Sequence, residues 1–196
     1  MTTEKCLLNS VISTPKARAL TADIKHFYLN NHLLEPEYLK LHVSVIPDEI
    51  IAVYNLQNLQ DEKGWCYVKI FKGMYSLKQA GIIANQELQQ HMSSYGYITV
   101  QCTLGLWKHY NKEKIFSLAV DDFLFQYSSE EDAKHFLHAL RQKYTITVDR
   151  NAKKYIGIIL KWDYIKRTVE LSMPEYAKHA LHKFQHLLSS RPEHSP

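Results

Sequence analysis

Three aspartates carry the clearest chemical signal in this sequence. Asp23 stands where the apolar run ARALTA gives way to IKHFYLN, while Asp121 and Asp122 lie between the apolar runs KIFSLAV and FLFQY. These positions predict one carboxylate at the end of a strand and two at the tip of a hairpin. If the two strands are neighbours, the three carboxylates converge, and carboxylate oxygens are the ligands that Mg²⁺ prefers.

Converging carboxylates of this kind suit the transfer of a nucleotidyl group with two metal ions. Two ions about 3.5 to 4 Å apart stabilise both the attacking and the leaving oxygen of an in-line displacement. Each motif taken singly also fits a structural role, because Asp-Asp is a common turn signal and an Asp after a strand is often a helix cap. The residues around the aspartates decide between the two interpretations.

Positioning these residues requires alternating strands and helices. Hydrophobic alternation predicts strands at 17–24, 37–46, 66–71, 103–110, 114–120, 123–127, 155–162 and 168–173. Caps and helical spacing predict helices at 47–56, at about 80–95, after a capping box of Ser128 and Glu131, and from Ala177 to Leu188 after Ser172 and Glu175. This order predicts an α+β fold, an antiparallel sheet with helices packed on one face and a ferredoxin-like core. Polymerase palms and smaller binding modules share this pattern.

The composition fits one folded domain without a membrane segment. The 196 residues are 45% hydrophobic, and no apolar run approaches the roughly 18 residues that a membrane helix needs. The N-terminus has no signal-peptide pattern. A net charge of +4 permits an anionic partner without demanding one. The three scattered cysteines are predicted to be free thiols in a cytoplasmic or nuclear protein.

The segments around the aspartates form an ordered set of motifs. ALTADIKHFYLN contains Asp23, KGMYSLKQAGIIAN spans 72–85, LAVDDF contains Asp121 and Asp122, and YIGI precedes LKWDYIKRTVELSMPEYAKHAL. In this order and spacing, over about residues 5 to 186, the motifs resemble the reverse transcriptase of LTR retrotransposons of the copia type. The resemblance implies the palm of an RNA-directed DNA polymerase, cut from a retrotransposon Pol polyprotein and located in a cytoplasmic virus-like particle or in the nucleus.

The resemblance also implies the ligands of the site. Asp23 and Asp121 would be the principal ligands of two Mg²⁺ ions, for which Mn²⁺ can substitute, and Asp122 the accessory ligand. The substrates would be deoxynucleoside triphosphates and an RNA or DNA template with its primer. Tyr28 would lie under the incoming sugar, where its ring excludes a ribose 2′-hydroxyl; an ordinary core aromatic is the alternative.

Further residues receive binding roles from the same resemblance. Gln79 and Gly81 would pack against the nascent base pair, and Lys78 would meet template or primer phosphate. A solvated charge at a helix start is the alternative for Lys78. Tyr155 and Gly157 would contact the primer, with a strand bulge as the alternative for Gly157.

The sequence departs from the family pattern at several positions. His26, Ser76 and Ala119 replace residues that are more usual there, with glycine usual at position 76, and 22 residues precede Asp23. We therefore expect fingers, RNase H and integrase regions outside this sequence. The expected segments are a remnant of the fingers–palm junction (1–16), the palm (17–172), a first thumb helix (173–188) and a disordered tail (189–196).

A palm without fingers is expected to have low activity alone, because losing one electrostatic contact to the reacting phosphates costs about 100-fold or more. Two alternatives stay open beside the polymerase. One is a catalytically inactive remnant that at most binds nucleic acid. The other is an unrelated small-sheet RNA-binding module, in which aromatic side chains on the sheet would stack on bases.

Overall fold

The structure is a computed structural model of the 196-residue chain and describes residues 2–185. The chain forms two compact units. The first unit comprises the chain up to Lys25 and from Tyr95 onward, and the second comprises His26–Ser94. Among the described residues, no helix has the length and apolar character needed to cross a membrane.

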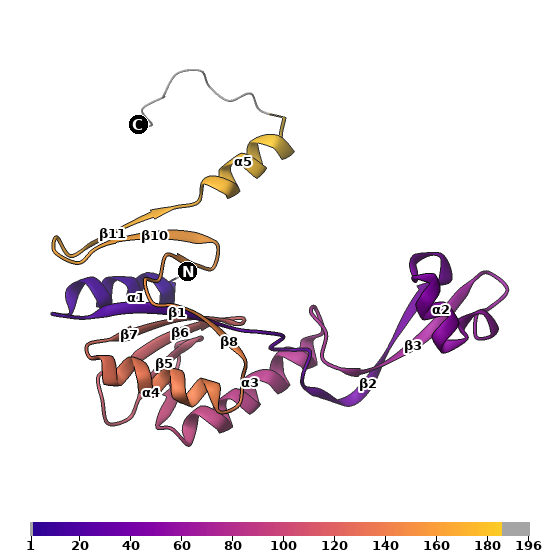
Figure 1. Cartoon of the computed structure of the whole chain (residues 1–196), viewed down its shortest axis with the longest axis horizontal. Coiled ribbons are helices and arrows are strands. Elements are labelled where there is room, and N and C mark those ends of the chain that lie inside the picture. The colour runs from indigo at the N-terminus through magenta and orange to yellow at the C-terminus, as the bar shows by residue number, and fades with distance from the viewer. Residues whose placement is uncertain (1, 186–196) are drawn as a thin grey trace. The chain divides into compact units, whose positions relative to one another are not determined.

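A six-stranded antiparallel sheet is the centre of the first unit, as Figure 1 shows. Its strand order is β4-β5-β6-β7-β1-β8, so β1 lies between β7 and β8 although about 100 residues separate it from β7 in the sequence. The strands are β1 (Arg18–Ile24), β4 (Tyr97–Thr99), β5 (Leu106–His109), β6 (Ile115–Ala119), β7 (Asp122–Tyr127) and β8 (Ile146–Asp149). The predicted α+β class with an antiparallel sheet is confirmed. The short strands β4 and β8 were not predicted.

One face of this sheet is covered by α4 (Glu130–Arg141). Phe136 of the helix stacks on Phe125 of β7 with ring centroids 4.1 Å apart. The apolar stripe of α4 is therefore its buried side, with Ala133, Phe136, Leu137 and Leu140. The predicted cap is shifted by one residue: the Ser129 hydroxyl, and not that of Ser128, accepts a hydrogen bond from the Asp132 amide.

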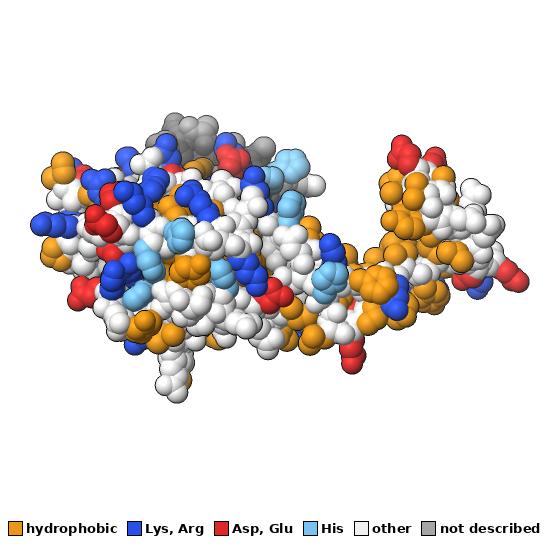
Figure 2. All heavy atoms as spheres, turned by 60° about the horizontal axis from the view of Figure 1, so that its bottom comes forward, with side chains coloured by type: hydrophobic (Ala, Val, Ile, Leu, Met, Phe, Trp, Pro, Cys, Tyr) orange, Lys and Arg blue, Asp and Glu red, His pale blue; other side chains and the backbone are white. Residues whose placement is uncertain are grey.

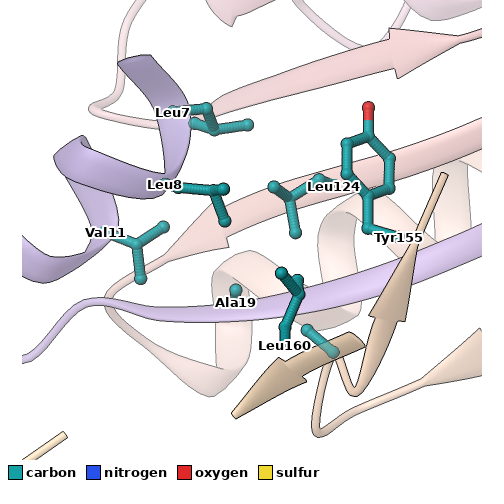
Figure 3. Packing of buried hydrophobic residues seen from close by; sticks show 8 residues of the cluster. Leu7, Leu8, Val11, Ala19, Leu124, Tyr155 and Leu160 are labelled. Atoms are coloured by element: carbon teal, nitrogen blue, oxygen red, sulfur yellow. The ribbon is translucent and has the colours of Figure 1, made fainter. Parts of the chain in front are cut away.

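The opposite face of the sheet carries α1 (Thr2–Ser13) and a second, three-stranded sheet (Figure 1). This sheet has the order β11-β10-β9, from β9 (Lys154–Tyr155), β10 (Ile158–Asp163) and β11 (Thr168–Ser172). Figure 3 shows Leu7, Leu8 and Val11 of α1 directed toward Leu124 and Leu160. The helix α1 was not predicted, because its three core residues are too few to establish a helical period in 12 residues.

The second unit contains a two-stranded antiparallel ribbon of β2 (His32–His42) and β3 (Trp65–Lys72). Between these strands lie α2 (Asp48–Tyr54) and two 3-10 turns, Val43–Val45 and Leu56–Asn58. The helix α3 (Lys78–Ser93) follows. The strand β2 begins earlier than predicted, since a register shift between His32 and Glu37 interrupts the alternation that marks a strand in the sequence.

The helix α5 (Pro174–Lys183) differs from its prediction. It starts after Met173 without a side-chain cap, so the expected capping box of Ser172 and Glu175 is wrong. None of its described residues is buried, and Phe184, which follows it, is exposed. The helix ends at Lys183 with Phe184 as its C-cap, so the predicted end at Leu188 is wrong, while the predicted tail at 189–196 falls outside the described residues. Cys6, Cys66 and Cys102 are free thiols, as predicted.

Candidate active site

The strands that carry the three aspartates are neighbours. The strands β1 and β7 pair antiparallel, and Asp23 and Asp122 are directly opposite each other at the end of the ladder. The Ile24 amide donates a hydrogen bond of 3.2 Å to the Asp121 carbonyl, which holds the following turn against β1. The condition set by the sequence, that the two strands lie side by side, is therefore met.

Asp121 lies in a tight turn, whereas its neighbour Asp122 belongs to strand β7. Ala119 and Asp122 are paired across the β6–β7 hairpin, so Val120 and Asp121 form the connecting turn and Asp122 is the first residue of β7. Val120 has a φ of +62°. A β-branched residue in this left-handed region is uncommon and carries backbone strain of order 1–3 kcal/mol. Strained backbone of this kind tends to be found at functional sites.

Strand alternation directs Asp23 and Asp122 to the same face of the sheet. Asp122 is two residues from Leu124, and Asp23 is four residues from Ala19. Leu124 and Ala19 both belong to the core beneath α1, so the two carboxylates stand on the side of the sheet that bears β9 and β10.

The three carboxylates influence one another electrostatically. Burial raises the pKa of Asp23, and the Asp121 carboxylate raises it further against the opposing effect of Lys25. Burial likewise raises the pKa of Asp122, with Asp121 and Asp23 adding to the effect and Lys154 opposing it. The site therefore concentrates negative charge that a bound cation would neutralise.

An open cavity of about 450 Å³ lies beside Asp23 and Asp122. Its walls come from β1, β7, β8 and the β9–β10 turn. The lining residues are Thr21, Ala22, Asp23, Asp122, Thr147, Asp149, Lys154, Ile156 and Gly157. Gly157, predicted as a primer contact, thus shares a cavity with two of the predicted metal ligands.

Two charged residues of this cavity, Asp149 and Lys154, were missed by the sequence analysis. The Asp149 carboxylate accepts hydrogen bonds from the amides of Asn151 at 2.9 Å and Lys153 at 2.7 Å, and so orders the turn that leads to Lys154. An Asp two residues before an Asn is a recognisable turn signal. Nothing local in the sequence places Lys154 near Asp122, because the two residues belong to different sheets.

The two predicted primer contacts differ in their surroundings. Gly157 has a φ of +81° and Ile156 a φ of +44°, and they form the two-residue turn between the paired residues Tyr155 and Ile158. The alternative of a strand bulge at Gly157 is therefore wrong. Tyr155 is buried under α1, and its hydroxyl lies 3.0 Å from that of Ser117. Its burial raises the pKa of the hydroxyl.

The remaining predicted site residues belong to the second unit. The Tyr28 ring meets the Tyr75 ring edge-on at 5.4 Å, and a Cβ at Gly81 would lie 3.9 Å from the Tyr28 ring. The Gln79 amide donates to the Glu37 carboxylate at 2.6 Å. Lys78 is exposed at the first position of α3. Tyr28 and Gly81 are thus neighbours, while the aspartates belong to the first unit.

The donor set of the aspartates fits a divalent metal by its chemistry. Carboxylate oxygens suit Mg²⁺ and Mn²⁺, and the register of β1 and β7 brings Asp23 and Asp122 to the same end of the ladder. Within residues 2–185, no three His, Cys, Asp or Glu side chains are already gathered into a metal-binding group. Binding of an ion would therefore have to draw the aspartate side chains together.

Comparison with known proteins gives a family match along nearly the whole sequence. Residues 7–195 match the model of the family described as reverse transcriptase (RNA-dependent DNA polymerase). Two telomerase structures are also similar. An apo telomerase from Candida tropicalis, truncated from its C-terminal domain, has 13% identity and a TM-score of 0.42. A telomerase from Candida albicans, in complex with a fragment of telomeric RNA, has 13% identity and a TM-score of 0.46. Each match covers 87% of this chain, which spans 38% and 33% of the two telomerase chains.

Proposed function

The chain belongs to the reverse transcriptase (RNA-dependent DNA polymerase) family, and from this membership we propose that it is the palm of a retrotransposon polymerase that extends a DNA primer on an RNA or DNA template. The observation that carries the proposal is the register of β1 and β7, which places Asp23 opposite Asp122 and next to the Asp121 turn. Family membership also removes the alternative of an RNA-binding module unrelated to polymerases.

Two divalent ions are proposed to bind at these carboxylates, with Asp23 and Asp121 as principal ligands and Asp122 as the accessory one. When bound, such ions would favour ionisation of the primer hydroxyl and neutralise charge on the phosphates. The contribution of the chain is to hold carboxylates on paired strands at the rim of an open cavity. The short turn of Val120 and Asp121 supports this role, because it limits where the Asp121 carboxylate can move.

Lys154 is proposed to meet a phosphate of the primer or nucleotide. It lines the cavity together with Asp122, and its positive charge opposes the rise in the pKa of that carboxyl, so it lies beside the proposed metal ligands. Asp149 is proposed as a positioning residue, since its carboxylate is occupied by backbone amides of the turn that precedes Lys154. A cation held at this place would supply electrostatic stabilisation to the reacting phosphates.

Gly157 and Tyr155 are proposed to act in different ways on the primer. Gly157 lies at the cavity with nothing within 4 Å of a Cβ built on it, so the primer backbone has room to approach the turn. Tyr155 is buried, and it would support the primer site by anchoring β9 to the core through its ring and its contact with Ser117.

The proposed nucleotide-binding residues are Tyr28, Gln79 and Gly81, with Lys78 as a phosphate contact. The position of Gly81 beside the Tyr28 ring, which a Cβ built at 81 would contact at 3.9 Å, supports a shared role for these two residues. Contact of Gln79 with a base pair would require exchange of its hydrogen bond to Glu37.

Primer extension tests the proposal. Incorporation of dTTP on a poly(A) template with an oligo(dT) primer and Mg²⁺ is compared between wild type, Asp121→Asn and Asp48→Asn. We expect Asp121→Asn to lower the rate about 100-fold or more, as loss of an active-site electrostatic group does. Asp48→Asn makes the same chemical change at an exposed position of α2 and should leave the rate unchanged. Equal incorporation by wild type and Asp121→Asn would show that Asp121 is not a ligand of a catalytic metal ion.

A second candidate is a catalytically inactive remnant that still binds primer–template duplex. The backbone at Ser76 favours it: the φ of this residue is +75°, in the left-handed region where the family usually has glycine. Serine bears a steric cost there that glycine avoids, as expected of a copy that no longer needs full activity. A remnant would bind duplex with an affinity that falls steeply with salt, and would incorporate no nucleotide.

A further inference from the structure

One face of the β2–β3 ribbon presents an alternating set of aromatic and basic side chains. Residues directly opposite each other in an antiparallel pair point to the same face. The register pairs Tyr38 with Lys69, Lys40 with Tyr67, and His42 with Trp65. Together with Phe71, two residues beyond Lys69, these side chains form what we call the aromatic–lysine face: Tyr38, Lys40, His42, Trp65, Tyr67, Lys69 and Phe71.

The two lysines of this face lie over its rings. Lys40 Nζ is 5.0 Å from the centre of the Trp65 ring and 5.6 Å from that of Tyr67. Lys69 Nζ is 4.9 Å from the centre of the Phe71 ring and 6.0 Å from that of Tyr38. Each cation therefore bridges two aromatic side chains, which pre-orders both the rings and the charges.

The aromatic–lysine face is not needed to pack the ribbon. The opposite face carries the buried Cys66 and the half-buried Leu41, Val68 and Ile70. In contrast, Tyr38 and Tyr67 are 63% and 67% exposed. Figure 2 shows hydrophobic side chains, which include Tyr and Trp, gathered along this ribbon. Acidic side chains lie at the end of the ribbon that carries α2. A concentration of exposed rings of this kind indicates a binding surface.

The chemistry of the face selects among possible partners. Single-stranded nucleic acid offers both the flat bases that stack on aromatic rings and the phosphates that pair with lysines. A duplex hides the faces of its bases within the stack. An apolar protein surface would bury the Lys40 and Lys69 ammonium groups without partners, which costs free energy. The nearby Asp61 carboxylate is already engaged by the amides of Lys63 and Trp65.

We propose that the aromatic–lysine face of the β2–β3 ribbon binds single-stranded nucleic acid, and that the bound strand is the unpaired part of the template. The identity of the strand as template rests on the proposed polymerase function. Strand side chains on one face repeat about every 6.8 Å, so Trp65 and Tyr67 offer neighbouring places along β3 for bases of an extended strand, and Phe71 offers a third place beyond Lys69. Stacking of this type tolerates any base sequence.

The role of the rings is tested by measuring the binding of fluorescein-labelled (U)20 and (dT)20 to the full chain. Fluorescence anisotropy reports the binding, in the absence of metal and nucleotide. We expect Tyr67→Ala to weaken binding about 5- to 100-fold, because one stacked base is lost. Tyr67→Phe keeps the ring and should bind as wild type does. Tyr54→Ala removes a tyrosine of matched exposure, 65%, from α2 in the same unit and should have no effect. Circular dichroism melting verifies that each variant is folded.

The salt dependence of binding tests the lysines. Loss of two phosphate contacts makes the slope of log affinity against log salt shallower by about 1.4 for single strands. We expect this change in a Lys40→Gln, Lys69→Gln double variant. Lys161→Gln with Lys178→Gln removes the same charge at exposed positions paired with carboxylates, and should keep the wild-type slope.

Several outcomes would overturn the ribbon site. Equal binding by wild type and Tyr67→Ala would do so, as would equal weakening by Tyr67→Ala and Tyr54→Ala. A loss confined to duplex binding, or self-association through this face in sedimentation, would assign it another partner. Because the assay needs no catalysis, binding by this face together with equal incorporation by wild type and Asp121→Asn would count against the polymerase proposal and leave the ribbon site in place.

Discussion

At the scale of single residues, the three aspartates work against the stability of the fold that holds them. Burial and mutual repulsion raise the pKa values of Asp23 and Asp122, so their ionised forms are less favourable in the folded chain than in the unfolded one. This unfavourable contribution is fully present above the raised pKa values and is relieved as the pH falls through them. Such a conflict is expected where charge is kept for a ligand.

Neutralising one aspartate should therefore stabilise the metal-free protein. We expect Asp121→Asn to raise the free energy of unfolding by about 0.5–2 kcal/mol at pH 7, the usual range for removing an unfavourable charge. Urea denaturation in the presence of EDTA measures it. The conservative Asp48→Asn variant, at an exposed position, should lie within about 0.5 kcal/mol of wild type. A loss of stability in Asp121→Asn would mean that the carboxylate has a structural role.

Two histidines with lowered pKa values should affect how the stability of the fold depends on pH. Burial lowers the pKa values of His109 and His135, and the positive charge of Lys114 lowers them further. The Asp132 carboxylate opposes the shift at His109, and the Tyr97 hydroxyl lies 3.2 Å from His135 Nδ1. Both rings are thus favoured as neutral groups in the folded chain.

Because the unfolded chain takes up these protons first, stability should fall as the pH drops below the ordinary histidine value of 6.5. Urea unfolding at a series of pH values from 7.5 to 5 measures this slope. His135→Gln removes one titrating group and should make the slope shallower. An unchanged slope would show that other groups control the acid response.

At the scale of elements, α1 is stabilised more by packing against the sheet than by the helix propensity of its own sequence. Its Leu7, Leu8 and Val11 fill the core between the two sheets of the first unit, as Figure 3 shows. Isolated helices of 12 residues are marginal in water, so tertiary contacts must supply its stability. The same contacts fix the face of the sheet on which β9 and the β9–β10 turn meet the aspartates.

Truncation of an α1 core residue should destabilise the whole first unit. We expect Leu7→Ala, at a residue 1% exposed, to lower the free energy of unfolding by about 2–5 kcal/mol. Leu104→Ala makes the same change at a residue that is 95% exposed, and should have little effect. Thermal or urea denaturation of both variants measures these changes in stability. Similar losses at both positions would mean that α1 is not docked on the sheet.

The turn before α3 offers a test of backbone strain. Ser76 has a φ of +75°, which glycine adopts without the steric cost that serine bears. We expect Ser76→Gly to stabilise the chain by about 1 kcal/mol after allowing for the greater freedom of glycine in the unfolded state. Chemical denaturation measures the change. Ser44→Gly, at an exposed residue with negative φ, should destabilise or be neutral.

At the scale of the whole molecule, binding of metal should couple the site to the stability of the chain. A ligand that binds the folded state alone stabilises it by about 2.7 kcal/mol at 100 times its dissociation constant. We expect Mg²⁺ or Mn²⁺ to raise the melting temperature of wild type, and not that of Asp23→Asn with Asp121→Asn. Removal of the metal with EDTA should return wild type to its starting value. A rise of equal size in the double variant would place metal binding elsewhere.

The division into two units separates the two proposed binding surfaces. The first unit carries the aspartates and their cavity, while the second carries Tyr28, α3 and the aromatic–lysine face. No sheet among the described residues is shared between the units, so the proposed catalytic and strand-binding surfaces can be altered independently. Variants of the ribbon are therefore suited to test nucleic-acid binding without changing the proposed metal ligands.

The sequence by itself determined the features that short windows encode. Alternation marked β1, β6 and β7, helical spacing marked the buried stripe of α4, and the ordered motifs around the aspartates identified the family. Strand alternation, turn chemistry and motifs depend on residues within a few positions of one another, which is why they can be read locally.

Only the tertiary structure decided which distant residues meet. The pairing of Asp23 with Asp122, the position of Lys154 beside them and the burial of α1 depend on contacts between segments far apart in the sequence. The same holds for the exposed apolar side of α5, which has the periodicity of a buried helix. Periodicity shows that a face is apolar, but packing against the rest of the chain determines whether it is covered.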